Sequence, residues 1–243
     1  MRDPYPERTL LGFSRVDGTV WFYSRIAALL SSDSKVLDIG CGRGAAAADP
    51  LDYRRSLTIL KGRCAHVMGI DVSPEGQANP LVDEFRLIER PERWPIDDMS
   101  VDLAICDWVV EHVEAPRKFF AECSRVLQPG GTLCIRTPNL LGYPALIARA
   151  VPKSWHARLL RSVQPSRSEI DVFPAFYRCN TRRSLTQALT SAGFHSVVMP
   201  YEAEPAYLDF SPTLYRVAAS VNQHLPPALR RTLVAFARRR EAL

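Results

Sequence analysis

Three alternating glycines that follow an acidic residue, in the segment Lys35–Gly44 (K-V-L-D-I-G-C-G-R-G), are the residues best suited to chemistry. Gly40, Gly42 and Gly44 have no Cβ, so the backbone can turn with positive φ and come close to a ligand. Asp38 places a negative charge just before that loop. A carboxylate repels a pyrophosphate and attracts a cation. The segment therefore predicts a binding site for a cationic ligand.

Two other interpretations of the same loop remain. Gly40, Gly42 and Ala45 also match the loose dinucleotide pattern G-x-G-x-x-G/A. Asp38 argues against a dinucleotide, because its charge would lie beside the pyrophosphate. A glycine-rich turn without any ligand is the third interpretation, and the motifs that follow along the chain argue against it.

The elements that must position this loop are a strand and a helix. Val36, Leu37 and Ile39 form a short apolar run bounded by glycines, which is typical of a buried parallel strand. The alanines at 45–48 have high helix propensity, so we expect the loop to begin a helix. Strand, loop and helix N-terminus together predict a nucleotide site at the carboxyl edge of an α/β sheet.

Further strands alternate with helices along the chain. A second buried strand at 66–71 ends at Asp71, an acid that can accept both hydroxyls of a ribose. We expect a third strand at 85–88, a fourth at 101–106 that leads to Asp107, and a fifth at 132–136. Amphipathic helices are predicted at 17–30, 115–127 and 181–192, with sixth-strand residues at 194–201.

The motif V-L-D-I-G-C-G-R-G resembles the first motif of class I S-adenosylmethionine-dependent methyltransferases. The segments at 94–113 and 127–139 resemble later motifs of that family, in the same order. The resemblance implies a Rossmann-like seven-stranded sheet in the order 3-2-1-4-5-7-6, with helices on both faces. It implies S-adenosylmethionine as the cofactor, bound by Asp38, Gly40, Cys41, Gly42, Gly44, Asp71, Val72, Asp107 and Trp108. The chain departs from the family pattern after the third strand, so Glu89, Arg93 and Trp94 are only candidates for contacts with adenine.

We expect four parts in one domain: an N-terminal helical cap at 1–34, a cofactor-binding core at 35–139, an insertion at 140–180 that lids the acceptor pocket, and a C-terminal part of the same fold at 181–243. In similar enzymes an N-terminal helix covers the active site. Tyr5, Trp21 and Tyr23 therefore either reach the substrate or simply pack.

The candidate catalytic residues are His112, Tyr177 and Arg178. An imidazole exchanges protons near neutral pH, so His112 suits a general base if the acceptor is a hydroxyl. A purely structural His112, hydrogen-bonded at a helix terminus, is the alternative. Tyr177 and Arg178 suit contacts with a polar or anionic small molecule, unless Arg178 only pairs with Asp171 to hold the loop.

Composition narrows the class of protein. The 243 residues are 47% hydrophobic, enough for one sizeable core. The six cysteines contain no C-x-x-C pair, so we expect reduced thiols and neither a disulfide framework nor a metal site. We expect no transmembrane segment and no signal peptide, hence a cytoplasmic protein. The pattern does not specify an oligomeric state.

Charge is distributed unevenly along the chain. Residues 1–144 carry 17 Lys and Arg against 20 Asp and Glu, whereas residues 145–243 carry 14 against 6. The basic part fits an anionic, glycan-linked or lipid-linked acceptor, peripheral contact with a membrane, or ordinary solvated arginines. Basic residues are not interleaved with aromatics, so we expect no nucleic-acid binding.

The segment at 231–238 fits either a basic amphipathic membrane helix or the antiparallel seventh strand of the family, and its short apolar run favours the strand. The predicted function is methyl transfer from S-adenosylmethionine to a small-molecule acceptor, on oxygen, nitrogen or carbon. A cofactor-binding module without activity and an NAD-dependent oxidoreductase are the alternatives. The sequence lacks a recognisable Tyr-x-x-x-Lys pair for hydride transfer.

Overall fold

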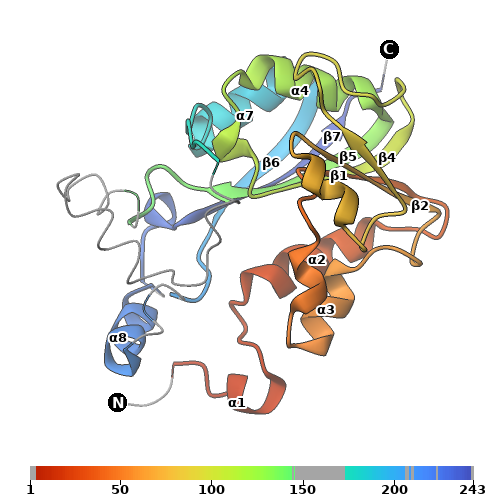
Figure 1. The fold of residues 1–243 in the computed structure, drawn as a ribbon. Helices are drawn as coiled ribbons and strands as arrows, with labels where there is room; N and C mark the ends of the chain where they lie inside the picture. Colours follow the sequence, from red (N-terminus) through yellow and green to blue (C-terminus); the bar gives the residue numbers. More distant parts are fainter. Residues whose placement is uncertain are drawn as a thin grey trace.

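A seven-stranded sheet in the order β3-β2-β1-β4-β5-β7-β6 organises the protein (Figure 1). The computed structural model describes residues 4–143, 145, 173–205, 208, 211–222 and 224–241. The strands are β1 (Lys35–Ile39), β2 (His66–Asp71), β3 (Glu84–Leu87), β4 (Val101–Asp107), β5 (Leu127–Pro138), β6 (Phe194–Tyr201) and β7 (Thr232–Arg239). The predicted strand order is confirmed.

The first five strands are parallel, and β7 is antiparallel to both of its neighbours, β5 and β6. Leu233, Val234 and Ala235 on β7 are fully buried, as expected for a central strand that is covered on both faces. The prediction of a strand at 231–238 is therefore confirmed, and the alternative of a membrane helix there is wrong.

Helices cover both faces of the sheet, as predicted (Figure 1). The α-helices are α1 (Arg8–Leu11), α2 (Gly18–Leu29), α3 (Asp52–Thr58), α4 (Pro116–Val126), α7 (Arg182–Ser191) and α8 (Pro212–Asn222), and the short 3-10 turns are η1 (Ala45–Ala48), η2 (Pro74–Ala78), η3 (Val110–His112) and η6 (Pro227–Leu229). Helices α4 and α7 pack on one face, whereas α2 and α3 lie on the other. No helix in the described ranges is long and apolar enough to span a bilayer.

Helix α2 is fixed at its start by a side chain and along its length by the core. The carboxylate of Asp17 accepts hydrogen bonds from the backbone N–H groups of Thr19 and Val20, both at 2.9 Å, which satisfies two donors that a helix terminus leaves free. Phe22 and Ile26, one turn apart, are fully buried against the sheet. Helix α2 is thus a fixed wall beside the sheet.

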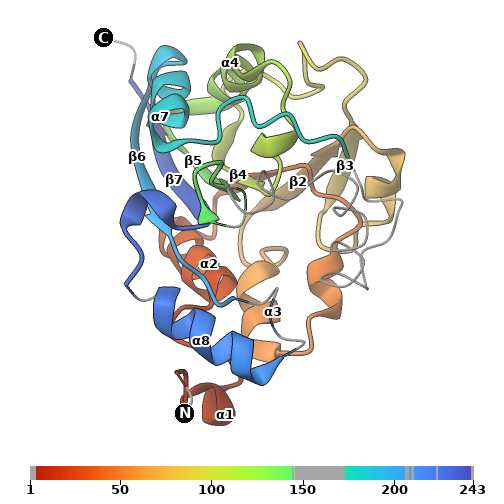
Figure 2. The same cartoon turned by 90° about the vertical axis from the view of Figure 1, so that its left-hand side faces the viewer.

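The N-terminal segment packs on α8, as both views show (Figure 2). The rings of Tyr5 and Tyr215 meet edge to face with centroids 6.4 Å apart. The ring of Trp21 on α2 packs against that of Tyr201 on β6, with the ring centroids 4.6 Å apart and the rings tilted by 32°. Tyr5 and Trp21 are therefore packing residues. Helix α8 was not predicted.

One predicted helix start is wrong. The alanine run at 45–48 forms only the 3-10 turn η1, because the chain turns at Asp49 and Pro50 before α3 begins. The carboxylate of Asp49 accepts the N–H of Leu51 at 2.9 Å and stabilises that turn. The predicted helix at 115–127 is confirmed as α4, and His112 ends the separate 3-10 turn η3 before it.

Replacing Phe22 tests the role of α2. Phe22→Ala should lower the free energy of unfolding by about 3 to 5 kcal/mol, since it empties a fully buried aromatic site. Leu29→Ala on the exposed face of the same helix is the matched control and should change it by less than about 0.5 kcal/mol. Urea denaturation measures both, and equal effects would show that α2 is not anchored through Phe22.

Candidate active site

Three carboxylates meet where parallel strands end. Asp38 lies near the end of β1, and Asp71 and Asp107 are the last residues of β2 and β4. Because β2, β1 and β4 are neighbours, their carboxyl ends share one edge of the sheet. A cavity of about 240 Å³ opens at this edge. Its lining includes Tyr23, Asp38, Gly40, Cys41, Gly44 and Asp107.

The three glycines of the loop have positive φ, at 70° for Gly40, 50° for Gly42 and 75° for Gly44. A Cβ on Gly40 would lie 2.4 Å from Cγ2 of Val109, and one on Gly44 would lie 2.3 Å from Oδ1 of Asn79. A Cβ on Gly42 would meet nothing within 4 Å. Packing therefore requires two of the glycines, whereas Gly42 faces open space beside the cavity.

Asp71 holds the loop in this conformation. Its Oδ2 accepts the N–H of Gly42 and its Oδ1 accepts the N–H of Ser73, both at 2.9 Å. Asp71 is only 7% exposed. A carboxylate oxygen has two acceptor sites, so each oxygen keeps one lone pair for a ligand. The neighbouring Val72 is exposed beside it.

Asp38 lines the cavity, and no cation or hydrogen-bond donor among the described residues compensates its negative charge. Within the described part of the chain, no side chain or N–H group donates a hydrogen bond to its carboxylate. Burial raises the pKa of Asp38 to about 7, and the charges of Asp107 and Asp71 add to the shift. Burial likewise raises the pKa of Cys41 to about 12, so its thiol is protonated and is not a nucleophile.

Asp107, in contrast, is compensated. Its Oδ1 accepts Nε–H of Arg136 at 2.6 Å, and its Oδ2 accepts Nη2–H of the same guanidinium at 2.6 Å. The hydroxyl of Tyr23 also donates to Oδ2, at 3.2 Å. Trp108, with φ of 59°, donates its N–H to the carbonyl of Arg136 and exposes its ring. Sequence reasoning missed Arg136, although a charged residue inside an apolar strand must have a partner.

Residues 173–178 pass over η3 and contact it through hydrogen bonds. The carbonyl of Glu111 accepts the N–H of Phe176 at 2.7 Å and that of Tyr177 at 3.1 Å. Nδ1 of His112 lies 2.9 Å from the carbonyl oxygen of Pro174. His112 and Tyr177, two of the three predicted catalytic residues, thus lie at the same contact between two segments. Arg178 follows Tyr177 in sequence.

Buried side chains next to this contact are linked by hydrogen bonds. Thr137 donates its hydroxyl to Glu111 at 2.9 Å, and Asn180 donates its amide to Thr137 at 2.7 Å. Burial raises the pKa of Glu111. Asp171, the alternative partner of Arg178, lies outside the described residues.

Trp94 is a core residue. It is 3% exposed and its ring meets that of Phe119 edge to face at 5.4 Å. The interpretation of Trp94 as a contact with adenine is therefore wrong. Arg93 pairs with Asp98 at 3.1 Å on the surface.

Known proteins match this chain over the segment that forms the cavity. Residues 37–135 match the model of a methyltransferase domain family. A probable S-adenosylmethionine-dependent methyltransferase of Mycolicibacterium smegmatis is 31% identical over 150 residues, 56% of this chain and 52% of that protein. Residues 37–135 of this chain therefore form a methyltransferase domain.

Other relatives extend the match. The mitochondrial ubiquinone biosynthesis O-methyltransferase of Rattus norvegicus is 29% identical over 217 residues, 81% of this chain and 57% of that protein. A solved S-adenosylmethionine-dependent methyltransferase from Archaeoglobus fulgidus shares the fold, with a TM-score of 0.55 and 19% identity over 96% of this chain and 97% of that one. The chain spans about half the length of these two curated relatives.

The cavity of this domain fits S-adenosylmethionine. S-adenosylmethionine carries positive charge on its sulfur and its amino group, which an uncompensated buried Asp38 would attract. It carries two ribose hydroxyls, for which Asp71 has free lone pairs. Gly42 leaves open the space that a side chain would fill.

Gly42 can be tested against a matched glycine. Gly42→Val should abolish binding of S-adenosylmethionine, because the side chain would enter the open space beside the cavity. Gly62 also has positive φ, at 78°, and also faces open space, so Gly62→Val should carry a similar backbone strain of about 1 to 2 kcal/mol. Calorimetry should find normal binding for Gly62→Val. If Gly42→Val folds and binds normally, the cofactor does not lie against the loop.

Asp38 should make stability depend on pH. The unfolded chain ionises this carboxyl at its ordinary pKa, whereas the folded protein keeps the proton up to about 7. The stability of the ligand-free protein therefore falls as pH rises across that interval, and the loss is complete above it. Asp38→Asn removes this cost, so the variant should melt higher than the wild type at about pH 8 and show little difference at about pH 4.

The same variant should lose affinity for S-adenosylmethionine, because the carboxylate that faces the cavity is gone. Thermal melting at both pH values, with calorimetric titration, measures the two effects together. Asp33→Asn, at an exposed position, is the control. A lower melting temperature for Asp38→Asn at the higher pH would refute the assignment.

Proposed function

We propose that this protein transfers the methyl group of S-adenosylmethionine to a small-molecule acceptor. The observation that carries the proposal is the uncompensated carboxylate of Asp38 in a buried cavity at the carboxyl edge of the sheet. A phosphate-bearing cofactor such as NAD would be repelled there. The family relationship supports the same cofactor.

In this proposal the cofactor is held by residues that the sequence singles out. Asp71 accepts the ribose hydroxyls, and Asp38 attracts the positively charged end. The loop from Gly40 to Gly44, including Cys41, lies along the cofactor, with Val72 and Trp108 at its margins. When bound, S-adenosylmethionine would supply a methyl carbon that an acceptor atom attacks in line, with the neutral thioether S-adenosylhomocysteine as the leaving group. Residues of the chain contribute mainly by orienting the two reactants and excluding water.

The acceptor would lie against the wall formed by His112, Tyr177 and Arg178. A carbonyl oxygen only accepts hydrogen bonds, so Nδ1 of His112 carries the proton in its contact with Pro174. In the neutral imidazole Nε2 then keeps its lone pair, which suits a general base. A hydroxyl acceptor must lose a proton, so this geometry favours O-methylation over transfer to carbon or to a neutral amine.

The name of one relative and the positive charge of Arg178 both support a polar or anionic acceptor. The rat relative is named a ubiquinone biosynthesis O-methyltransferase. Arg178, which is exposed beside Tyr177, would contact an anionic group, whether free or attached to a lipid or glycan. In this proposal residues 1–34 cap the site, 35–139 bind the cofactor and 181–243 complete the sheet. Most of the insertion at 140–180, expected as the acceptor lid, lies outside the described residues.

Two measurements test the proposed function. Calorimetric titration with S-adenosylmethionine and with NAD should show binding of the first alone. Incubation with S-adenosylmethionine labelled in its methyl group, followed by extraction of small molecules from a cell extract, should yield a labelled product. Binding without any labelled product would favour a cofactor-binding module, and binding of NAD instead would favour an oxidoreductase.

Substitutions at the acceptor wall should separate chemistry from folding. His112→Asn keeps an N–H that can donate to Pro174 but has no basic nitrogen. It should lower turnover by about 10²- to 10⁴-fold while the affinity for S-adenosylmethionine and the melting temperature stay nearly unchanged. Tyr177→Phe and Arg178→Ala should also lower turnover, with smaller effects on binding of the cofactor.

Arg183→Ala, at an exposed position on α7, is the control and should keep full turnover. Steady-state kinetics and melting curves on all four variants make the comparison. If stability, cofactor binding and turnover fall together in the wall variants, residues 173–178 have only a structural role.

A further inference from the structure

Arg136 is a cation inside the sheet, at the wall of the cavity. It lies on β5 directly opposite Asp107 of β4 in the strand register, and it is 6% exposed. Its guanidinium holds both oxygens of Asp107 at 2.6 Å in the bidentate geometry that makes the strongest ion pairs. Of the two charges, only Asp107 lines the cavity.

The same guanidinium reaches helix α2. Nη1 donates to Oγ1 of Thr19 at 3.1 Å. The centre of the guanidinium lies 5.2 Å from the ring of Phe22 and 5.3 Å from that of Trp108, distances at which a cation is attracted to an aromatic face. Tyr23 of α2 completes the contact by donating its hydroxyl to Asp107. One ion pair thus joins α2, β4 and β5 beside the cavity.

Stability alone does not account for this pair. A buried ion pair pays a large desolvation penalty, and well-packed apolar residues of similar volume are often as stable or more stable in its place. The difference between the neighbouring carboxylates is more informative. Asp107 has three donors, whereas Asp38 has none among the described residues.

We infer that Arg136 is a positioning residue of the cofactor site: it cancels the charge of Asp107 and holds α2 as the cavity wall, so that Asp38 supplies the negative charge that faces the sulfur of the cofactor. The inference rests on the proposed function. It predicts that Arg136 controls how strongly the site distinguishes a positively charged sulfur from a neutral one.

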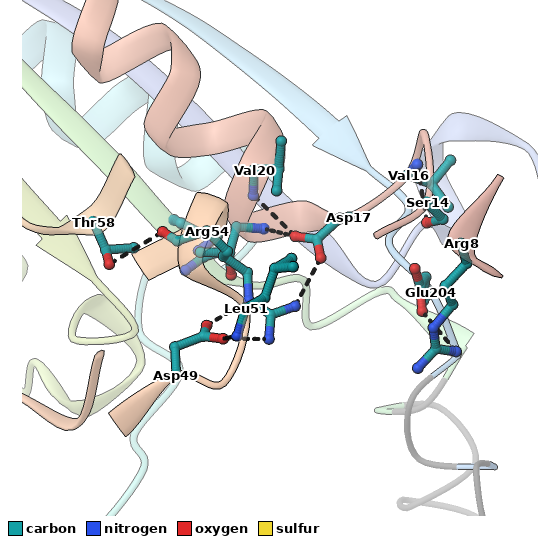
Figure 3. A network of polar contacts seen from close by, with 12 residues as sticks. Arg8, Ser14, Val16, Asp17, Val20, Asp49, Leu51, Arg54, Thr58 and Glu204 are labelled. Carbon is teal, nitrogen blue, oxygen red and sulfur yellow. Dashed lines mark hydrogen bonds and ion pairs between the residues drawn. The ribbon is translucent and has the colours of Figure 1, made fainter. Parts of the chain in front are cut away.

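The chain offers a matched ion-pair network that is not part of the cavity (Figure 3). Arg54 of α3 donates Nη1–H to Asp17 at 2.9 Å and Nη2–H to Asp49 at 2.8 Å. This pairing also ties α2 to a neighbouring element, because Asp17 caps α2. Removing Arg54 therefore weakens the attachment of α2 without changing the charge at the cavity wall.

Two ligands separate charge from structure. S-adenosylhomocysteine differs from S-adenosylmethionine by one methyl group and the positive charge on sulfur. Arg136→Gln leaves Asp107 uncancelled, so the ratio of the dissociation constant of S-adenosylhomocysteine to that of S-adenosylmethionine should rise about threefold to tenfold at about pH 8. Arg136→Lys keeps the charge and should bring the ratio back toward that of the wild type.

The partner residue should shift the ratio in the opposite direction. Asp107→Asn leaves the cation of Arg136 unopposed, so the ratio should fall below that of the wild type. The double variant Asp107→Asn with Arg136→Gln removes both charges and should restore the ratio, even if its melting temperature is lower. Arg54→Gln should lower the melting temperature and leave the ratio unchanged. Calorimetric titration of both ligands and thermal melting give all the values.

The outcomes distinguish the inference from the proposed function. An unchanged ratio in Arg136→Gln and in Asp107→Asn, with normal binding by the wild type, would overturn the inference and leave the proposed function intact. If Arg136→Gln does not fold, a ratio in Asp107→Asn that is not lower than that of the wild type would also overturn the inference and leave the proposed function intact. A wild type that binds neither ligand would overturn the proposed function and the inference with it.

Discussion

The concentration of negative charge at one edge of the sheet is the constraint on which the rest of this structure depends. Parallel strands end at the same edge, so Asp38, Asp71 and Asp107 are brought together by topology. Mutual repulsion and burial make such a cluster costly. The protein compensates two of the three charges, with backbone N–H groups at Asp71 and a guanidinium at Asp107, and leaves Asp38 uncompensated. That asymmetry is the physical basis of the cation preference proposed for the cavity.

Sequence reasoning succeeded where the signal is local. The apolar runs at 35–39 and 66–71 and their terminal acids can be read directly, because burial on both faces requires continuous apolar residues. The strand order came from the family resemblance, and the match of the ordered motifs explains why it was correct. The break at Asp49-Pro50 is also visible in the sequence, but the propensity of the alanines at 45–48 does not show that they form only a 3-10 turn.

The features that could not be predicted are non-local. Arg136 meets Asp107 only through the register of β4 against β5, and it meets Thr19 across more than a hundred residues of sequence. Segment 173–178 reaches η3 mostly through backbone atoms, which leave no signature in side-chain types. The sequence therefore predicts the candidate cofactor site better than it predicts the acceptor wall, which is where we place the specificity for the acceptor. Single-sequence patterns report burial and turns, and they do not report which charges meet.

The position of β7 in the sheet affects the order in which the chain can fold during synthesis. β7 follows β6 in sequence, yet it lies between β5 and β6. Among the described residues, it is the one strand that pairs with β6. During synthesis the strands that carry the three carboxylates can assemble as soon as β5 has left the ribosome. The outer edge of β5 then stays unpaired until residues 232–239 emerge, roughly a hundred residues later. An open apolar edge of this kind is a template for wrong pairing. The interval in which the cofactor half is already formed is therefore also the interval in which this edge is open to wrong pairing.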